Sequence, residues 1–272
     1  MKDIVKAIGL ITLICFSFFY TEQVITVVNE QDPIMIKINN EKDNYKVDVI
    51  EAIIKDNSMI PGINGKEVDV EKSYNNMKEL GMFKDSYLIY IEVSPSNSLT
   101  NIYDKYIVRG NPYKKEVSII FTVTNDNELN NILNNIDKSY DINIFIDYKI
   151  LSNNLDKLKK TNYNIYPYGE YNKDTLILSN NLIKNNFNSS LYCLTSENKV
   201  IEECTNNKMH TIKPTNILSN AYNEIRKVLN NGNIILIENN SKNIKEFIYV
   251  YRYIYSKGLK VVSLEELLCE KR

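Results

Sequence analysis

The chain has 272 residues, enough for one large domain or two small ones, since domains contain about 100–200 residues. A content of 43% hydrophobic and 25% charged residues is typical of a packed protein and excludes disorder as the main state. The 33 Lys and Arg residues against 34 Asp and Glu residues exclude a general nucleic-acid partner, which requires a basic excess. The single His, His210, and four Cys supply too few ligands for most zinc sites, so we expect no metal and no cofactor.

An apolar run over residues 7–20 follows Lys2 and Lys6. The run is shorter than the ~20 residues of a membrane span and has the length of the hydrophobic region of a secretory signal. No small-residue cleavage site follows it. We therefore expect residues 1–23 to be a signal peptide or an uncleaved membrane anchor, with the remaining chain outside the cytoplasm, secreted or anchored. A buried N-terminal helix is the alternative.

The cysteines bear on this expected export. Cys15 lies in the apolar run, which leaves the odd set Cys193, Cys204 and Cys269. A disulfide between Cys193 and Cys204 would join a strand to the next helix. A chain of this length needs no such crosslink, however, and we expect two buried free thiols.

Residues 24–112 show a mixed pattern that indicates a small α+β unit. The pattern predicts short strands at Val24–Val28 and Ile34–Ile38, a helix at Val68–Leu80 with Gly81 as its C-terminal cap, and a strand at Tyr87–Val93. We assign no function to this unit.

Residues 113–272 alternate apolar runs with amphipathic helices. The predicted strands are 117–123, 142–146, 164–166, 191–194, 209–212, 233–237 and 259–262. The predicted helices are 129–136, 151–158, 176–183, one that opens at 200–201, 217–229, 244–255, and a last one with a capping box of Ser263 and Glu266. Apolar strands between helices indicate a parallel sheet covered by helices. About seven strands favour an α/β fold of the distorted (β/α) barrel type.

Two C-terminal segments show a characteristic order of helix, turn and strand. Glu224–Ile237 combines a helix, a Gly turn and an apolar strand, and Ile244–Gly258 leads into Leu259–Leu268, which ends in Ser-Leu-Glu-Glu-Leu-Leu. With the element order, these segments resemble the polysaccharide deacetylase (NodB-homology) family over about residues 115–268. The resemblance implies a barrel whose active members use a divalent metal, held by one Asp and two His, and a second Asp as base. Such a metal polarises the acetamide carbonyl and activates water.

The family's metal-binding residues have no match in this sequence. Phe121–Asn125 occupies the place of the Phe-Asp-Asp-Gly-Pro turn, with Thr122 where the base would stand and Val123 where the metal Asp would stand. No His pair follows, and Glu238 occupies the place of the His after the penultimate strand. The resemblance therefore implies a degenerate member with no metal site and no assignable catalytic residue. Asp126 is expected to N-cap the next helix, and we interpret His210 as structural.

Tyr166–Asn172 contains a Pro-Tyr-Gly turn like the family's Arg-Pro-Pro-Tyr-Gly loop. Its Arg is absent, and the spacing places Leu191–Leu194 better at that motif. Tyr rings near strand ends stack on sugar rings, so we predict a ligand-binding set near the carboxyl ends of the strands. The set is Thr122, Asp126, Tyr166, Tyr168, Glu170 and Glu238.

Three functions follow from these features. The first is a catalytically inactive, polysaccharide deacetylase-like protein of the cell envelope that binds cell-wall glycan. The second is an active deacetylase or hydrolase with a non-standard site built from carboxylates such as Asp126, Asp147, Glu170 and Glu238. The third is a scaffold, anchored to the membrane through residues 7–20, in an envelope or spore-associated complex. We favour the first.

Overall fold

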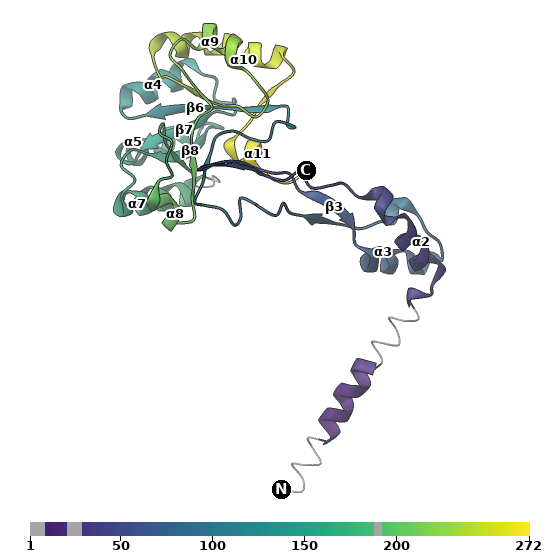
Figure 1. Cartoon of the computed structure of the whole chain (residues 1–272). Helices are drawn as coiled ribbons and strands as arrows, with labels where there is room; N and C mark the ends of the chain where they lie inside the picture. Colours follow the sequence, from purple (N-terminus) through teal and green to yellow (C-terminus); the bar gives the residue numbers. More distant parts are fainter. Residues whose placement is uncertain (1–8, 21–28, 188–191) are drawn as a thin grey trace, which may run out of the picture. The chain divides into compact units, whose positions relative to one another are not determined.

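The computed structural model describes residues 9–20, 29–187 and 192–272 (Figure 1). The chain divides into two compact units. One contains Met1–Val49 and Gly65–Val93, and the other contains Ile50–Asn64 and Ser94–Arg272. Residues 9–20 are helical, with exposed apolar side chains. Among the described residues, no helix combines the length and the apolar character that crossing a membrane requires.

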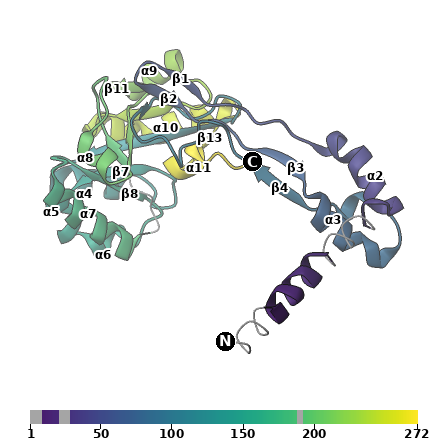
Figure 2. The same cartoon turned by 60° about the horizontal axis from the view of Figure 1, so that its bottom comes forward.

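From residue 33 on, the smaller unit contains helices and a two-stranded antiparallel sheet. Its elements are α2 (Pro33–Glu41), η1 (Lys42–Tyr45), β3 (Gly65–Val68), α3 (Val70–Met77), η2 (Lys78–Leu80), η3 (Asp85–Tyr87) and β4 (Tyr90–Val93). Strands β3 and β4 pair antiparallel (Figure 2). The predicted helix near Val68–Leu80 is confirmed, and Gly81 ends it at a φ of 66°.

The predicted strand at Ile34–Ile38 is wrong, because these residues lie in α2. Asp32 caps that helix by accepting a hydrogen bond from the Ile34 amide at 2.8 Å, and Pro33 suits the first helical turn. Ile34 and Ile38 then face one buried side at i, i+4 spacing. The predicted strand at Val24–Val28 lies outside the described residues.

The larger unit contains two sheets. One has the order β11-β12-β6-β7-β8, with β13 beside β6, and all its pairs are parallel. Its strands are β6 (Glu116–Val123), β7 (Asn143–Asp147), β8 (Asn164–Tyr168), β11 (Asn216–Leu218), β12 (Ile234–Ile237) and β13 (Lys260–Val261). The other sheet has the order β1-β2-β5-β10-β9 and is parallel except for β1 with β2. Its strands are β1 (Ile53–Lys55), β2 (Ser58–Ile60), β5 (Tyr106–Ile107), β9 (Tyr192–Leu194) and β10 (His210–Ile212).

The predicted parallel α/β architecture is thus present, whereas a closed barrel is not established by the strand pairing. Within the described residues, β8 and β9 form no ladder. The two sheets are linked along another edge, where the Lys213 amide donates to Ile107 O at 2.8 Å and the Thr215 amide donates to Ile234 O at 2.7 Å. Strands β1, β2 and β5 precede residue 112, yet they belong to this unit because β5 pairs with β10.

Two apolar cores sandwich the strands of the larger unit. The helices are α4 (Asp126–Asn135), α5 (Tyr148–Asn153), α6 (Leu155–Leu158), α7 (Lys173–Asn186), α8 (Glu202–Asn206), α9 (Ala221–Val228), α10 (Ser241–Ser256) and α11 (Leu264–Leu268). Figure 1 shows α4, α9 and α10 on one side of β6. Phe121 and Val123 of β6 face the core under these helices, whereas Ile120 faces a second core that includes Leu264 and Leu267 of α11. Both strand faces are therefore buried, as the apolar strand runs predict.

Two predicted helix starts need correction. Asn125, not Asp126, caps α4, because the Asn125 Oδ1 accepts the Glu128 amide at 3.0 Å. Asp126 instead accepts a hydrogen bond from Asn154 Nδ2 at 2.9 Å. The predicted helix over 217–229 begins at Ala221, because Ile217 lies in β11, which pairs with β12.

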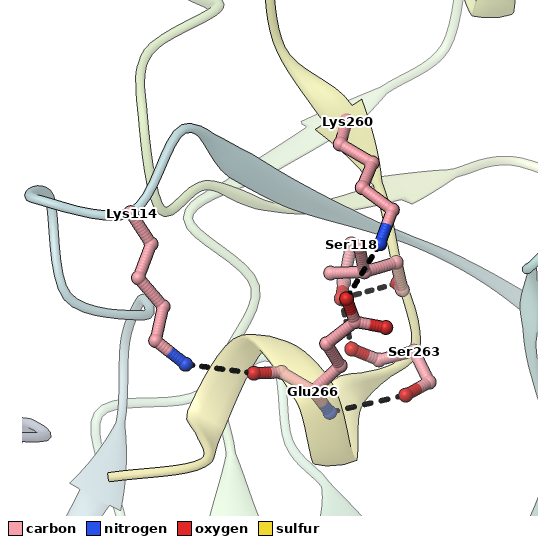
Figure 3. A network of polar contacts seen from close by, with 6 residues as sticks. Lys114, Ser118, Lys260, Ser263 and Glu266 are labelled. Atoms are coloured by element: carbon pink, nitrogen blue, oxygen red, sulfur yellow. Dashed lines mark hydrogen bonds and ion pairs between the residues drawn. The ribbon is translucent and has the colours of Figure 1, made fainter. Parts of the chain in front are cut away.

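Helix α11 is fixed to β6 and β13 by the polar network of Figure 3. The Ser263 Oγ accepts the Glu266 amide at 3.0 Å, which confirms the Ser263 half of the predicted capping box. The Glu266 carboxylate does not return to the cap and instead pairs with Lys260 Nζ at 2.7 Å. Ser118 of β6 donates its hydroxyl to Val262 O at 2.8 Å. The last helix is therefore anchored to the central strand.

The expectation of two free thiols is wrong, because Cys193 and Cys204 form a disulfide between β9 and α8. Both cysteines are fully buried beside Leu176 and Met209. Their proximity comes from β9 pairing with β10, whose residue His210 follows α8 closely in the chain. The spacing of the two cysteines allows this bond but does not decide between it and two free thiols.

Candidate functional site

A pocket of about 580 Å³ lies at the carboxyl ends of the strands of the larger unit. It is lined from β6, β8, β9, β11 and β12, and from the chain that follows β8 and β9. The lining residues used below are Thr122, Tyr168, Gly169, Tyr171, Thr195, Ser196, Glu197 and Lys199. This end of parallel strands is where α/β proteins bind their ligands.

Strand alternation explains which side chains reach the pocket. Phe121 and Val123 face the core beneath the outer helices, so Thr122 between them points to the other side. On β8, Ile165 faces the core under the helices. Tyr168 packs against the second core, which includes Ile120 and α11, and borders the pocket. The floor of the pocket is therefore formed by the second core, at the carboxyl ends of the strands.

Tyr171 joins two parts of the pocket wall. Its hydroxyl donates to Pro167 O at 3.1 Å and accepts from the Leu194 amide at 2.9 Å, which ties the end of β8 to β9. Burial raises the pKa of the Tyr171 phenol well above its usual range, so the hydroxyl keeps its proton. Gly169 forms the turn between the end of β8 and Tyr171, with a φ of 110°, a conformation that favours glycine.

The segment 195–201 forms another wall and lies between the two cysteines of the disulfide. Within it, Glu197 and Lys199 form an ion pair at 2.7 Å, with both side chains exposed. The Thr195 amide donates to Ile212 O at 2.8 Å, which fixes the start of the segment to β10. Sequence reasoning missed these residues, because a polar Ser-Glu-Asn-Lys stretch carries no sign of a site.

The structure brings together two members of the predicted ligand-binding set. Thr122 and Tyr168 both line the pocket. Tyr166 lies beneath it with no exposed surface, and its hydroxyl donates to the Glu265 carboxylate and lies 3.3 Å from Asn143 Oδ1. Asp126 is held by Asn154 in the first turn of α4 and is not among the lining residues. Glu170 and Glu238 are exposed and are also absent from the lining.

Comparisons with known proteins identify the fold. No family model matches the sequence. A CE4 family pseudoenzyme from Bacillus anthracis is similar with a TM-score of 0.60 and 24% identity, over 89% of this chain and 97% of that one. A mutant of that pseudoenzyme with restored enzymatic activity gives a TM-score of 0.62, also at 24% identity, over 88% and 99% of the two chains. A peptidoglycan N-acetylglucosamine deacetylase gives 0.52 at 13% identity, over 61% and 95%.

The chain has the polysaccharide deacetylase fold. This confirms the family resemblance at the level of the fold. In sequence, the chain is 35% identical over 105 residues to the Bacillus subtilis protein YlxY, which is described as uncharacterized. That match spans 38% of this chain and about a third of the relative's length.

The residues present do not fit the metal that active members of the deacetylase fold hold. Among the described residues, no three His, Cys, Asp or Glu side chains are grouped so as to bind an ion. Val123, at the position of the metal Asp, is buried in the core under helices α4, α9 and α10. His210 stacks on Tyr103 with ring centroids 4.6 Å apart, and burial lowers its pKa to about 4. It is held as a neutral structural side chain on β10.

The carboxylates of the non-standard site do not meet in the pocket either. Asp147 Oδ1 accepts the Lys149 amide at 2.8 Å and caps α5. Asp147, like Asp126, Glu170 and Glu238, is absent from the lining. Glu197 is the acid that does line the pocket, and it is paired with Lys199. The pocket therefore offers hydroxyl groups, a Tyr ring and one ion pair.

Proposed function

We propose that this deacetylase-fold protein binds a glycan in the pocket and does not carry out metal-dependent deacetylation. The observation that supports the proposal is a pocket at the strand ends in which Tyr168 and hydroxyl groups remain, while Thr122 and Val123 occupy the motif positions. Binding and catalysis need different groups, so a site can lose its metal ligands and keep its shape.

The lining suits a sugar ring. The half-buried Tyr168 offers an aromatic surface against which the apolar face of a sugar packs. The hydroxyls of Thr122, Thr195 and Ser196 act as both donors and acceptors toward sugar hydroxyls. The peptidoglycan N-acetylglucosamine deacetylase with a similar fold suggests N-acetylglucosamine polymers as the ligand class.

Retention of the full chain on insoluble peptidoglycan, and titration with a chitin hexamer, test this proposal. Tyr168→Ala and the exposed Glu197→Gln should each weaken binding by about fivefold, because each removes roughly 1 kcal/mol of contact energy. Tyr113→Ala serves as the matched control, because Tyr113 is 76% exposed and lies outside the pocket. Absence of retention by the unaltered chain on both probes would refute glycan binding.

The alternative of an active hydrolase has a direct assay. Acetylated chitin oligomers are incubated with the chain and with added zinc or cobalt, and released acetate is measured. We expect acetate at the level of the protein-free control. Metal-dependent turnover that disappears in Tyr168→Ala would replace the binding proposal with a catalytic one.

We also propose that the protein acts outside the cytoplasm. The disulfide between Cys193 and Cys204 supports this, since such bonds persist in oxidising compartments. Cell fractionation with thiol alkylation should find these two cysteines blocked by their bond and the protein outside the cytoplasm. The mass of the N-terminal peptide then distinguishes a secreted protein from one anchored through residues 7–20. A cytoplasmic protein with alkylated Cys193 and Cys204 would contradict the proposal.

A further inference from the structure

The exposed side of α10 carries an aromatic and basic surface that the pocket does not use. Lys245, Tyr249, Arg252 and Tyr255 follow one another at spacings of three or four residues, which places them on one side of the helix. Tyr249 and Tyr255 expose 52% and 63% of their surface. Among the described residues of α9 and α10, these are the exposed large apolar side chains. We call this surface the α10 tyrosine face.

A hollow of about 510 Å³ lies beside this face. Its lining includes Tyr140, Tyr251, Arg252, Tyr255 and Ser256. The Tyr140 and Tyr251 rings have centroids 4.3 Å apart at 18°, and the Tyr251 and Tyr255 rings have centroids 6.4 Å apart at 21°. Three nearly parallel rings therefore border one hollow, with a guanidinium group at its edge.

Helices α9 and α10 carry a net charge opposite in sign to that of the whole chain. Helices α9 and α10 contain Arg226, Lys227, Lys242, Lys245 and Arg252 against Glu224 and Glu246, a balance of five minus two, or +3. The whole chain has a net charge of −1. In the part of the chain that the structure describes, no hydrogen bond or ion pair engages the Arg252 side chain. An exposed guanidinium beside aromatic rings is a strong donor for anionic oxygens.

We propose that the α10 tyrosine face is a second binding site, for a carbohydrate polymer that carries anionic groups. Sugar rings pack against Tyr255 and Tyr251, and a carboxylate or phosphate of the polymer binds Arg252, with Lys245 adding attraction. Burial, with the nearby Asp141 carboxylate, raises the pKa of Tyr251, so its hydroxyl stays a neutral donor. The site shares no residue with the strand-end pocket.

A polymer fits this face better than a lipid surface does. Helices that lie on membranes present protruding Leu, Phe or Trp side chains. Here the exposed aromatic residues are Tyr249 and Tyr255, and Tyr255 borders the hollow. Since an anionic lipid surface would also attract Arg252 and Lys245, the test includes it as a separate probe.

The test measures binding of the full chain to three probes: an oligosaccharide of alternating glucuronate and N-acetylglucosamine, a neutral chitin hexamer, and phosphatidylglycerol vesicles. We expect the anionic oligosaccharide to bind, and binding to weaken as salt is raised. Arg252→Gln and Tyr255→Ala should each reduce its affinity about tenfold, with Arg252→Lys intermediate. Tyr113→Ala should leave it unchanged.

Each other outcome overturns the inference. Equal affinity of all variants for the anionic oligosaccharide, or no binding of it, would remove the site. Vesicle binding that falls in Arg252→Gln, without oligosaccharide binding, would assign the face to lipid. A loss in Tyr168→Ala with none in Arg252→Gln would place the anionic glycan in the strand-end pocket. If glycan binding in the strand-end pocket is refuted, the inference about the α10 tyrosine face still stands, because its test relies on variants of Arg252 and Tyr255.

Discussion

Thr122 and Val123 are adjacent on β6 but face opposite sides of the sheet. Thr122 reaches the pocket, whereas Val123 is fully buried against the outer helices. A substitution at Thr122 therefore acts on ligand binding, whereas a substitution at Val123 acts on the packing of the core. The His210 side chain also has a role set by its surroundings. Its ring stacks on the Tyr103 ring, and burial lowers its pKa.

Installing an Asp at either motif position should not create a metal site. Thr122→Asp places one carboxylate in the pocket, and no His is available there to complete the coordination. We expect no stoichiometric zinc by elemental analysis and no acetate release. Val123→Asp should lower the free energy of unfolding by more than about 3 kcal/mol, because it buries an unpaired carboxyl group. Stoichiometric zinc in Thr122→Asp would contradict the conclusion that the ligand set is lost.

The stability of the fold should depend on His210 at acidic pH. Its pKa is lowered to about 4, against 6.5 for an unperturbed His. Between these values the unfolded chain binds a proton that the folded chain does not, so stability falls as pH drops from about 6.5 to about 4. The loss reaches at most about 3 kcal/mol. Urea unfolding at pH 7.5 and pH 5 should show a smaller difference for His210→Phe, which keeps a ring against Tyr103. An equal difference in both proteins would disprove this role.

Among the elements, the start of α10 is joined to β11, α9 and β12 by one buried side chain. Asn243 Oδ1 accepts the Ala221 amide at 3.0 Å, and its Nδ2 donates to Glu238 O at 2.9 Å and to Ser219 O at 3.2 Å. Asn243 has no exposed surface. Three connections at the carboxyl end of the sheet therefore depend on a single amide group.

Removing that amide should be costly. Asn243→Ala leaves several buried backbone groups unpaired, and we expect the free energy of unfolding to fall by about 3 kcal/mol. Asn134→Ala is the control, because Asn134 is exposed on α4 and should change stability by less than about 0.5 kcal/mol. Denaturant titration measures both. A change for Asn243→Ala as small as that of the control would show that water replaces the lost bonds.

For the whole molecule, the disulfide does two things at once. It links β9 to α8 at a sequence separation of 11, and it bounds the segment 195–201 that lines the pocket. Without this bond, the free energy of unfolding and the shape of the pocket wall should change together. Cys269, exposed at the end of α11, has no such role.

Replacing both bonded cysteines tests this coupling. A loop of this size stabilises a fold by about 3 kcal/mol in the chain-entropy estimate. Cys193→Ala with Cys204→Ala should therefore lower the melting temperature by about 6–12 °C and weaken chitin-hexamer binding. Cys269→Ser should change neither quantity. Unchanged binding together with a lowered melting temperature would separate the pocket from the disulfide.

The sequence by itself determined the alternating architecture and showed that Thr122 and Val123 stand where the deacetylase motif has its two Asp residues. Long periodic elements such as β6, α7 and α10 are predicted well, because their burial pattern repeats several times within one segment. The replacement of the motif residues by Thr122 and Val123 also needs no coordinates, since Val cannot bind a metal. The resemblance to the deacetylases rests on these local features, and the fold agrees with it.

Only the tertiary structure decided which residues share a site. Strands β1, β2, β5 and β11 are two or three residues long, too short for a period, and they are specified by pairing with distant partners. The burial of Tyr166 beneath Tyr168, the inclusion of Glu197 in the pocket wall and the bond between Cys193 and Cys204 have the same origin. Local sequence fixes the periodicity of a segment, whereas contacts between distant segments depend on how the strands pair and pack.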